Sequence, residues 1–368
     1  MASHAFSLAV RPDEQFSTDV KPRLADLADM ADSPLPPDSP APLTRVPRSR
    51  IASSIPRSLR FPLVVATSLG INALARTLTA DISGFEFAPA SRDPNLRPEL
   101  VGYLVAAKVA ELGVAWAAGY DYEDLAALSL LTNQPYYYLL YSFWSVQLIP
   151  IVASLSIDLA AIAIPFALLR PRPALREARA ARSVNQRLAQ DWQIILLTAI
   201  LAACVYAVTF SLFYFLDLGV FLISHFDDIP SLESAHEANI PKMLALFAAS
   251  GFGAMMFLFR PTLAAAGKPS LIESKAKGRR ARKFNPETAT LGETLGHNFG
   301  LNLQLSHRAD VLLERAIVLV VCTIANTVVR VWGTVQGTDL VGSLGYAGLW
   351  ALAHSVVGVV YAWLGNEQ

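Results

Sequence analysis

The chain has 368 residues, of which 53% are hydrophobic and 16% are charged, and its mean hydropathy is +0.39. A soluble domain carries about 25% charged residues, so this composition excludes an ordinary soluble protein and indicates an integral membrane protein. The formal net charge is zero, because 30 Lys and Arg residues balance 30 Asp and Glu residues. The two signs are segregated into different loops, and this segregation bears on orientation in the membrane more than the sum does.

The first 60 residues show no core-forming pattern. They mix both charge signs and include the proline-rich stretch ADSPLPPDSPAPLTRVP at 31–47. Prolines hold the backbone extended and cannot donate hydrogen bonds, so we predict a disordered tail over 1–60 that could bind protein partners. The tail ends in RVPRSRIASSIPRSLR, which places five arginines next to the first apolar segment.

Seven apolar segments follow the tail. A membrane span needs about 20 residues, because each residue adds 1.5 Å of helix and the hydrocarbon core is roughly 30 Å thick. The pattern predicts an all-α fold, a polytopic bundle of six or seven apolar helices. The segments lie at about 61–80, 101–118, 136–169, 194–216, 243–259, 316–332 and 341–363.

The segment 136–169 is long for one span, since a single helix of this length would measure roughly 51 Å. A hairpin folded at Pro150 would need a turn in QLIPIVAS, which contains no Gly, Asn or Asp. We therefore expect one tilted passage, in which 146–168 cross the bilayer and Asp158 lies near the middle. The aromatic residues that precede it are expected to form a girdle at the membrane interface. The girdle residues are Tyr136, Tyr137, Tyr138, Tyr141 and Trp144.

Charged loops set the expected orientation. The loop 170–193 has six arginines and one acid within its first 18 residues, and the loop 260–310 contains KAKGRRARK. The positive-inside rule places both loops in the cytoplasm. The acidic stretch FDDIPSLESAHEANIP at 226–241 belongs on the other side. We thus predict five membrane helices over 61–259 and a transmembrane hairpin over 311–368 that ends in the cytoplasm.

The first two apolar segments do not fit this scheme. A cytoplasmic basic tail and an external GYDYED at 119–124 require an odd number of crossings between them, but two segments lie there. Either one segment lies along the interface or is re-entrant, or the tail lies on the far side of the membrane. The first segment carries Arg76 near its end, where an interfacial anchor is the expected role, and the second carries Lys108 and Glu111.

Ionisable residues inside the apolar segments are the candidate functional residues, because charges in lipid are costly and often serve ion or substrate binding. Lys108 and Glu111 are three residues apart on one helical face and can pair. Asp158 has no partner within its own helix, so we expect Arg330 or His354 to meet it across the bundle. The alternative for all five residues is a structural role, since buried polar groups also tie helices together.

The sequence contains no phosphate-binding glycine loop, no metal-binding histidine motif and no complete protease motif. We therefore expect no catalytic residue, no cofactor and no metal, and we favour a protein that is not an enzyme. The small residues of AASGFG at 248–253 are expected to allow close approach of two helices rather than to form a nucleophile elbow.

A cluster of six cationic residues within 275–283 could bind anionic lipid headgroups, at about 1 kcal/mol for each Lys or Arg. It could instead serve only as a topology signal or bind a protein receptor. No aromatic platform accompanies the charges, so we expect no nucleic acid partner. The cluster consists of Lys275, Lys277, Arg279, Arg280, Arg282 and Lys283.

Three functions are consistent with these features, and a membrane-embedded transferase or hydrolase is the least favoured of them. The favoured interpretation is an organising or anchoring protein of the endoplasmic reticulum or another endomembrane, with a lipid-facing basic loop, because several short spans suit a thin bilayer. The alternative is a secondary transporter or channel that uses the intramembrane Asp158, together with Arg330, His354 or the pair of Lys108 and Glu111.

Overall fold

The computed structural model describes seven parts of the chain, and these parts are almost entirely helical. The predicted tail up to residue 54, the basic stretch 171–190 and the cationic cluster at 275–283 lie outside the described residues. The described ranges are 55–80, 86–91, 99–170, 191–227, 229–231, 240–265 and 307–366.

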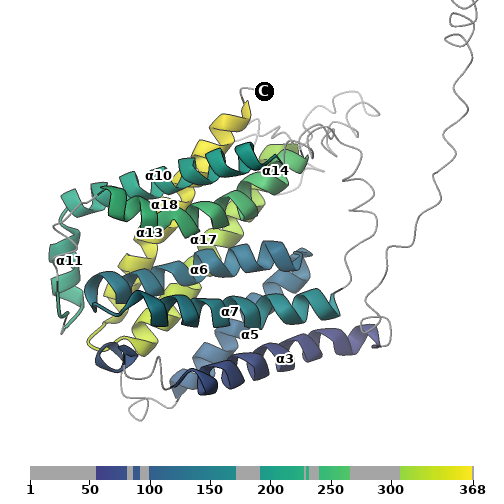
Figure 1. Ribbon diagram of the computed structural model, residues 1–368, viewed down its shortest axis with the longest axis horizontal. Coiled ribbons are helices and arrows are strands. Elements are labelled where there is room, and N and C mark those ends of the chain that lie inside the picture. Colours follow the sequence, from purple (N-terminus) through teal and green to yellow (C-terminus); the bar gives the residue numbers. More distant parts are fainter. Residues whose placement is uncertain are drawn as a thin grey trace, which may run out of the picture. The chain divides into compact units, whose positions relative to one another are not determined.

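The described residues form eight long helices (Figure 1). Seven of the described helical segments are long and apolar enough to cross a membrane, which confirms the all-α fold and the class of multi-pass membrane protein. Four shorter elements complete the bundle: η1 (Ala88–Ala90), α11 (Leu218–His225), the π-helix η3 (Met255–Phe259) and α14 (Arg260–Ala265). The long helices are α3 (Arg57–Leu78), α5 (Glu99–Ala118), α6 (Tyr122–Phe143), α7 (Leu148–Leu169), α10 (Trp192–Phe215), α13 (Ile240–Ala254), α17 (His307–Thr334) and α18 (Leu340–Asn366).

The stretch 136–169 forms parts of two helices. The expected crossing of 146–168 corresponds to the span Leu148–Leu169, but the expectation that 136–145 belong to the same passage is wrong. α6 ends at Phe143 and α7 begins at Leu148, and the two helices lie side by side (Figure 1). The chain reverses through Ser145, whose φ is +53°. The N–H groups of Trp144 and Val146 both donate to the carbonyl of Leu140 at 3.2 Å, so these two N–H groups of the turn are satisfied without water.

α6 lies in the interior of the bundle, which overturns the expected aromatic girdle. The side chains of Tyr137 and Tyr138 are 3% and 4% exposed, and Trp144 is 5% exposed. The hydroxyl of Tyr346 on α18 donates to the carbonyl of Pro135 inside α6 at 2.8 Å. These tyrosines are core residues because α6 packs against α7, α13 and α17 rather than facing lipid.

The additional helix changes which loops share an end of the bundle. We call one end the basic end, because the helix ends that flank the arginine-rich stretches 45–60, 171–190 and the cluster 275–283 lie there (Figure 1). Arg170 at the end of α7 donates to the carbonyls of Ala115 and Trp116 at 3.0 and 3.2 Å, next to the turn between α5 and α6. The sequence GYDYED therefore lies at the basic end, and the expectation that it lies opposite the arginine-rich loop is wrong.

The same arrangement accounts for the apolar segments 61–80 and 101–118, whose number of crossings did not fit the charges of the flanking loops. With α6 included, α3 and α5 both run the length of the bundle, and no segment has to be re-entrant. Near the start of α3, Phe61 packs on Trp116 at the end of α5, with ring centroids 5.7 Å apart. Across the basic end, Arg260 pairs with Glu123 at 2.9 Å.

Short contacts tie the loops of the opposite end together. Isolated bridges join Ser91 to Val335 and Phe226 to Thr338. His225 lies 3.1 Å from the carboxylate of Asp339, which also accepts a hydrogen bond from the N–H of Gly342. Although slight desolvation raises the pKa of Asp339, these two hydrogen bonds hold it below its ordinary value.

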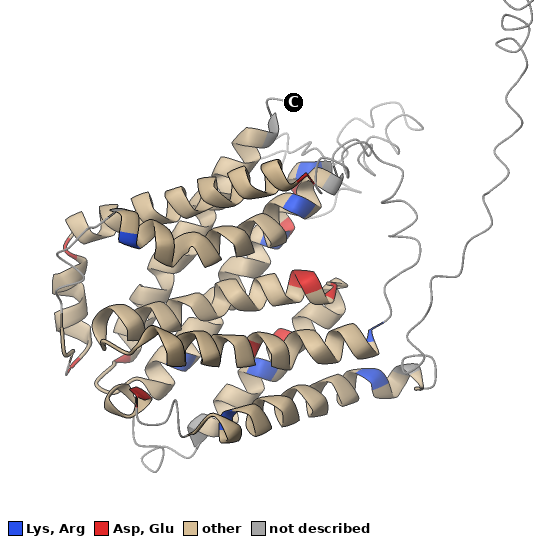
Figure 2. Cartoon of the chain, in the orientation of Figure 1, with Lys and Arg blue, Asp and Glu red and all other residues tan. Residues whose placement is uncertain are grey.

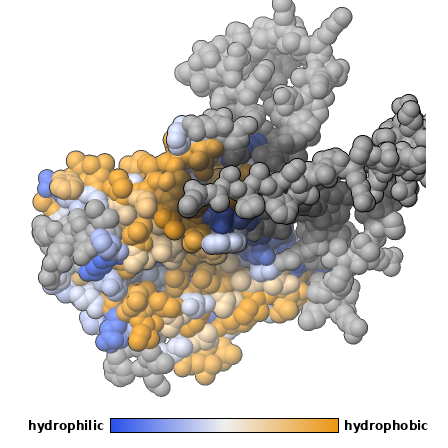
Figure 3. Space-filling model, turned by 45° about the horizontal axis from the view of Figure 1, so that its top comes forward, coloured by the Kyte–Doolittle hydropathy of each residue, from blue (hydrophilic) through white to orange (hydrophobic). Residues whose placement is uncertain are grey.

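Close helix packing occurs where the sequence predicted it. A Cβ added to Gly251 on α13 would collide with the carbonyl of Ala199 and with Ala203 on α10, so these two helices lie against each other there. Outside the core, apolar residues cover much of the described surface that Figure 3 shows, and polar residues gather in patches. This surface is that of a protein surrounded by hydrocarbon.

Candidate functional site

A charged cluster lies in the interior of the bundle around Asp158 of α7. Asp158 is 3% exposed. Its Oδ2 accepts a hydrogen bond from the hydroxyl of Tyr137 at 2.8 Å and lies 3.0 Å from Nη2 of Arg330. Its Oδ1 lies 2.6 Å from Nη2 of Arg76 and accepts from Nδ2 of Asn72 at 3.1 Å. The carboxylate is therefore bound by side chains from three other helices, α3, α6 and α17.

The two contacts from α3 follow from helical spacing. Asn72 and Arg76 are four residues apart, so they share one face of the helix, and Nε of Arg76 donates to Oδ1 of Asn72 at 2.8 Å. The Asn72 side chain thus holds the guanidinium from one side while Asp158 binds it from the other. About 42% of the Arg76 side chain is exposed, whereas 4% of the Asp158 side chain is.

Arg330 is held much more firmly than Arg76. Its side chain is 15% exposed, and its guanidinium lies over the rings of Tyr136 and Tyr137, at 4.5 and 5.2 Å from their centroids. Nη1 donates to Oδ1 of Asn133 on α6, which also accepts from Nδ2 of Asn326 at 3.0 Å. A planar guanidinium with this many partners has one defined position.

A cavity of about 580 Å³ adjoins the cluster and lies between α3 and α5, with α6, α7 and α17 behind it. Asp158, Arg76, Arg330 and Lys108 all line it, so the charged groups face the space rather than a packed interior. The volume falls in the range of about 300–1,000 Å³ that is typical of small-molecule sites.

The other predicted residues divide between this site and the rest of the bundle. Nζ of Lys108 lies 3.1 Å from Oε2 of Glu111, so the expected pair is present. Of the two partners expected for Asp158, the structure brings Arg330 to it and not His354. Nδ1 of His354 instead lies 2.6 Å from the hydroxyl of Tyr206, on the side of the bundle formed by α10 and α18.

Sequence reasoning missed three members of the cluster: Arg76, Asn72 and Tyr137. The polar residues Ser68, Asn72 and Arg76 recur every four residues within an apolar helix, and this pattern was the available signal. Because Arg76 lies near the end of its segment, the sequence favours an interfacial anchor at this position. Tyr137 carried no comparable signal, because it stands in a run of three tyrosines.

The formal charges around the cavity do not cancel. Arg76, Lys108 and Arg330 are positive, while Asp158 and the Glu111 that pairs with Lys108 are negative. Among the described residues, one positive charge is therefore left over in a cavity between apolar helices. A ligand with a single negative charge would neutralise it.

A second polar cluster lies at the basic end and is closed. Arg315 donates to both carboxylate oxygens of Asp124, at 3.1 and 3.0 Å, and to the carbonyl of Phe257 in the π-helix at 2.9 Å. Its guanidinium also lies 5.0 Å from the ring centroid of Tyr120. Burial raises the pKa of Tyr120 to about 12, although the charge of Arg315 opposes the rise. These contacts join α17 to α6 and to the π-helix, so this cluster ties helices together.

Comparison with protein-family models, curated proteins and solved structures finds no match to this chain. The described residues also contain no group of three or more His, Cys, Asp and Glu side chains that could hold a metal ion.

Proposed function

We propose that the protein is a secondary transporter for a monovalent anion and that the cavity beside Asp158 binds this anion. The observation that carries the proposal is the surplus positive charge in a cavity between membrane helices. An uncompensated charge away from water costs several kcal/mol, and a bound anion would offset this cost.

The two arginines have different roles in this proposal. Arg330 is fixed by Asn133, Tyr136 and Asp158, so it forms the stationary part of the site. Arg76 is more exposed and has fewer partners. The ion pair of Arg76 with Asp158 joins α3 to α7. A bound anion would compete with Asp158 for Arg76. Anion binding would thus loosen α3 from the bundle, which couples occupancy of the site to movement of a helix.

Flux through proteoliposomes tests the proposal. The probe is labelled octanesulfonate, a permanently charged monoanion that crosses lipid slowly by itself. We expect saturable efflux with the native protein and at least a tenfold lower rate with Asp158→Asn and with Arg330→Gln. Arg330→Lys keeps the charge and should retain part of the rate, which separates loss of transport from loss of folding.

The matched control is Arg260→Gln, which removes a partly exposed ion pair at the basic end, away from the cavity, and should transport like the native protein. If the native protein moves no sulfonate faster than empty vesicles do, or if Asp158→Asn transports normally while folded, the proposal is wrong.

We also infer that the basic end faces the cytoplasm, with both termini there, in an endomembrane such as the endoplasmic reticulum. The support is that three arginine- or lysine-rich stretches adjoin one end of the bundle, while the acidic stretch 227–237 adjoins the other. A membrane-impermeant maleimide should label Ser183→Cys from the cytoplasm and Ser234→Cys from the opposite side. Labelling of both from one side would contradict this orientation.

The organising function stays a second proposal, supported by the six cationic residues within 275–283. They follow α14 and precede α17, so they belong to a connection at the basic end. Replacing all six with Gln should weaken binding of the protein to vesicles that contain anionic lipid. Unchanged binding would remove the lipid-binding role.

A further inference from the structure

We propose that the anion is an amphiphile, a molecule with one negatively charged head and an alkyl chain, which reaches the cavity from the bilayer between α3 and α5. This inference rests on the proposed function and names the chemical class of its ligand. It is carried by the different chemistry of the two walls of the cavity and by the position of its opening.

The wall formed by α3 carries a row of polar residues beside two apolar ones, Leu69 and Ala73. Ser68, Asn72 and Arg76 are spaced by four residues and all line the cavity. Together they cover about 12 Å of helix, since each residue adds 1.5 Å. Ser68 is 1% exposed, and among the described residues its hydroxyl has no hydrogen-bond partner. A buried hydroxyl without a partner is expected to bond to whatever occupies the cavity.

The opposite wall, formed by α5, is apolar except at its inner end. Val101, Leu104 and Val105 line the cavity, and Lys108 follows one turn deeper along the same face. An inorganic anion would gain nothing from this wall and would lose hydration beside it. An alkyl chain would be buried against it, while the charged head reaches Arg76, Lys108 or Arg330.

The cavity opens toward the lipid-facing surface of the bundle. Val101 and Val105 line the cavity and are nevertheless 59% and 40% exposed, so the rim belongs to the outer surface of a membrane helix. The helices on either side are also the least buried spans. Only 11% of the most apolar window of α3, and likewise of α5, is buried, compared with 56% for the span Pro241–Leu263. A molecule already dissolved in the bilayer therefore meets the opening directly.

The experiment measures binding to the full-length protein in nanodiscs of uncharged lipid. The probes are methanesulfonate, octanesulfonate and hexadecanesulfonate, which share a head and differ in chain length, and hexadecyltrimethylammonium, which has the long chain with a positive head. We expect affinity to rise with chain length for the sulfonates and to be absent for the cation. Arg76→Gln should weaken hexadecanesulfonate binding by about tenfold, because one charge-assisted contact is lost.

A steric variant tests the route. Val105→Trp fills the rim between α3 and α5 and should also weaken hexadecanesulfonate binding by about tenfold. Val208→Trp is the matched control, because Val208 is 69% exposed on α10, away from the cavity, and it should bind within twofold of the native protein.

The outcomes separate this inference from the proposed function. If methanesulfonate binds as tightly as hexadecanesulfonate and Val105→Trp changes nothing, the ligand is a water-soluble anion, and only the amphiphile is ruled out. If no sulfonate binds, both proposals fail. If the long-chain cation binds as tightly as the sulfonate, the probes merely partition into lipid, and the amphiphile site is overturned.

Discussion

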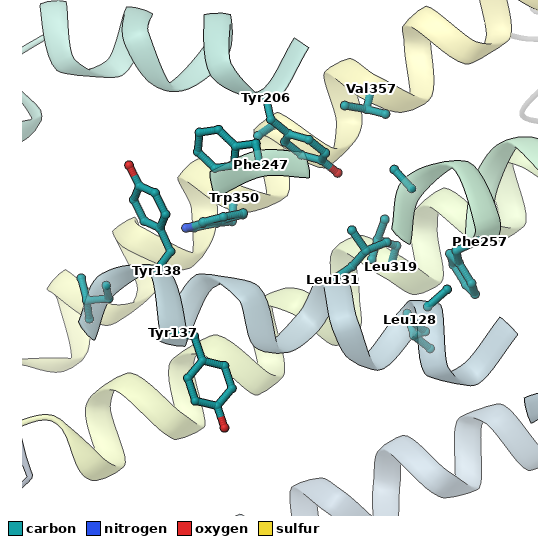
Figure 4. Packing of buried hydrophobic residues seen from close by; sticks show 14 of the residues in the cluster. Leu128, Leu131, Tyr137, Tyr138, Tyr206, Phe247, Phe257, Leu319, Trp350 and Val357 are labelled. Carbon is teal, nitrogen blue, oxygen red and sulfur yellow. The ribbon is translucent and has the colours of Figure 1, made fainter. Parts of the chain in front are cut away.

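The two sides of α6 are built from different chemistry. Tyr137 and Tyr138 are adjacent on this helix and point in opposite directions (Figure 4). The hydroxyl of Tyr137 donates to Asp158 in the charged cluster. The ring of Tyr138 lies among aromatic residues, 5.3 Å from Phe247 and 5.6 Å from Trp350. We call the side with α3, α5 and α7 the polar side, and the side with α10, α13 and α18 the aromatic side.

Figure 2 shows the same division for charge. Acidic and basic residues lie along the interior of the polar side, whereas the middle parts of α10, α13 and α18 carry none. Packed aromatic rings hold the helices of the aromatic side in one arrangement, because their contacts cannot be exchanged for others without creating voids. Ion pairs and hydrogen bonds hold the polar side, and a ligand can replace these one at a time. The difference indicates a rigid support on one side and a site that can rearrange on the other.

Breaking the charged cluster should have the largest effect on stability. Asp158→Leu leaves Arg330 buried without a counter-charge, and the loss is expected to be roughly 3–5 kcal/mol. The free energy of unfolding is measured by adding SDS to the protein in mixed micelles. The control is the double variant Asp158→Leu/Arg330→Met, which removes both charges and should recover much of the loss. A single variant as stable as the native protein would show that the cluster does not hold the polar side together.

On the aromatic side, the corresponding test is overpacking. Gly251→Leu should force α10 and α13 apart and cost about 1–3 kcal/mol in the same unfolding assay. Gly70→Leu is the matched control, because a Cβ at Gly70 on α3 would meet no atom within 4 Å. Anion binding should be unchanged in folded Gly251→Leu. If the free energy of anion binding fell by as much as the free energy of unfolding, the two sides would not be independent.

The sequence predicted the helical class, the need of Asp158 for a partner and the pairing of Lys108 with Glu111, because hydropathy and helical spacing are local properties. It did not predict the hairpin of α6 and α7. The polar first half of α6 hid this helix, and the reversal after it depends on Ser145 at positive φ, which serine seldom adopts. The contact of Arg76 with Asp158 joins residues 82 positions apart, and no local pattern specifies such a pair.

The two tyrosines provide the smallest and most direct test of the comparison. Tyr137→Phe removes a hydrogen bond to a carboxylate, and Tyr138→Phe removes the one to the hydroxyl of Tyr214. Each should cost about 1–2 kcal/mol of stability, with the bond to the charged group at the upper end. Their effects on anion affinity should differ, because only Tyr137 positions Asp158 and Arg330, and titration of both variants with octanesulfonate would measure this. Equal effects of the two variants on affinity would mean that α6 transmits changes from one side to the other, and the aromatic side would then be part of the binding site's mechanism rather than its support.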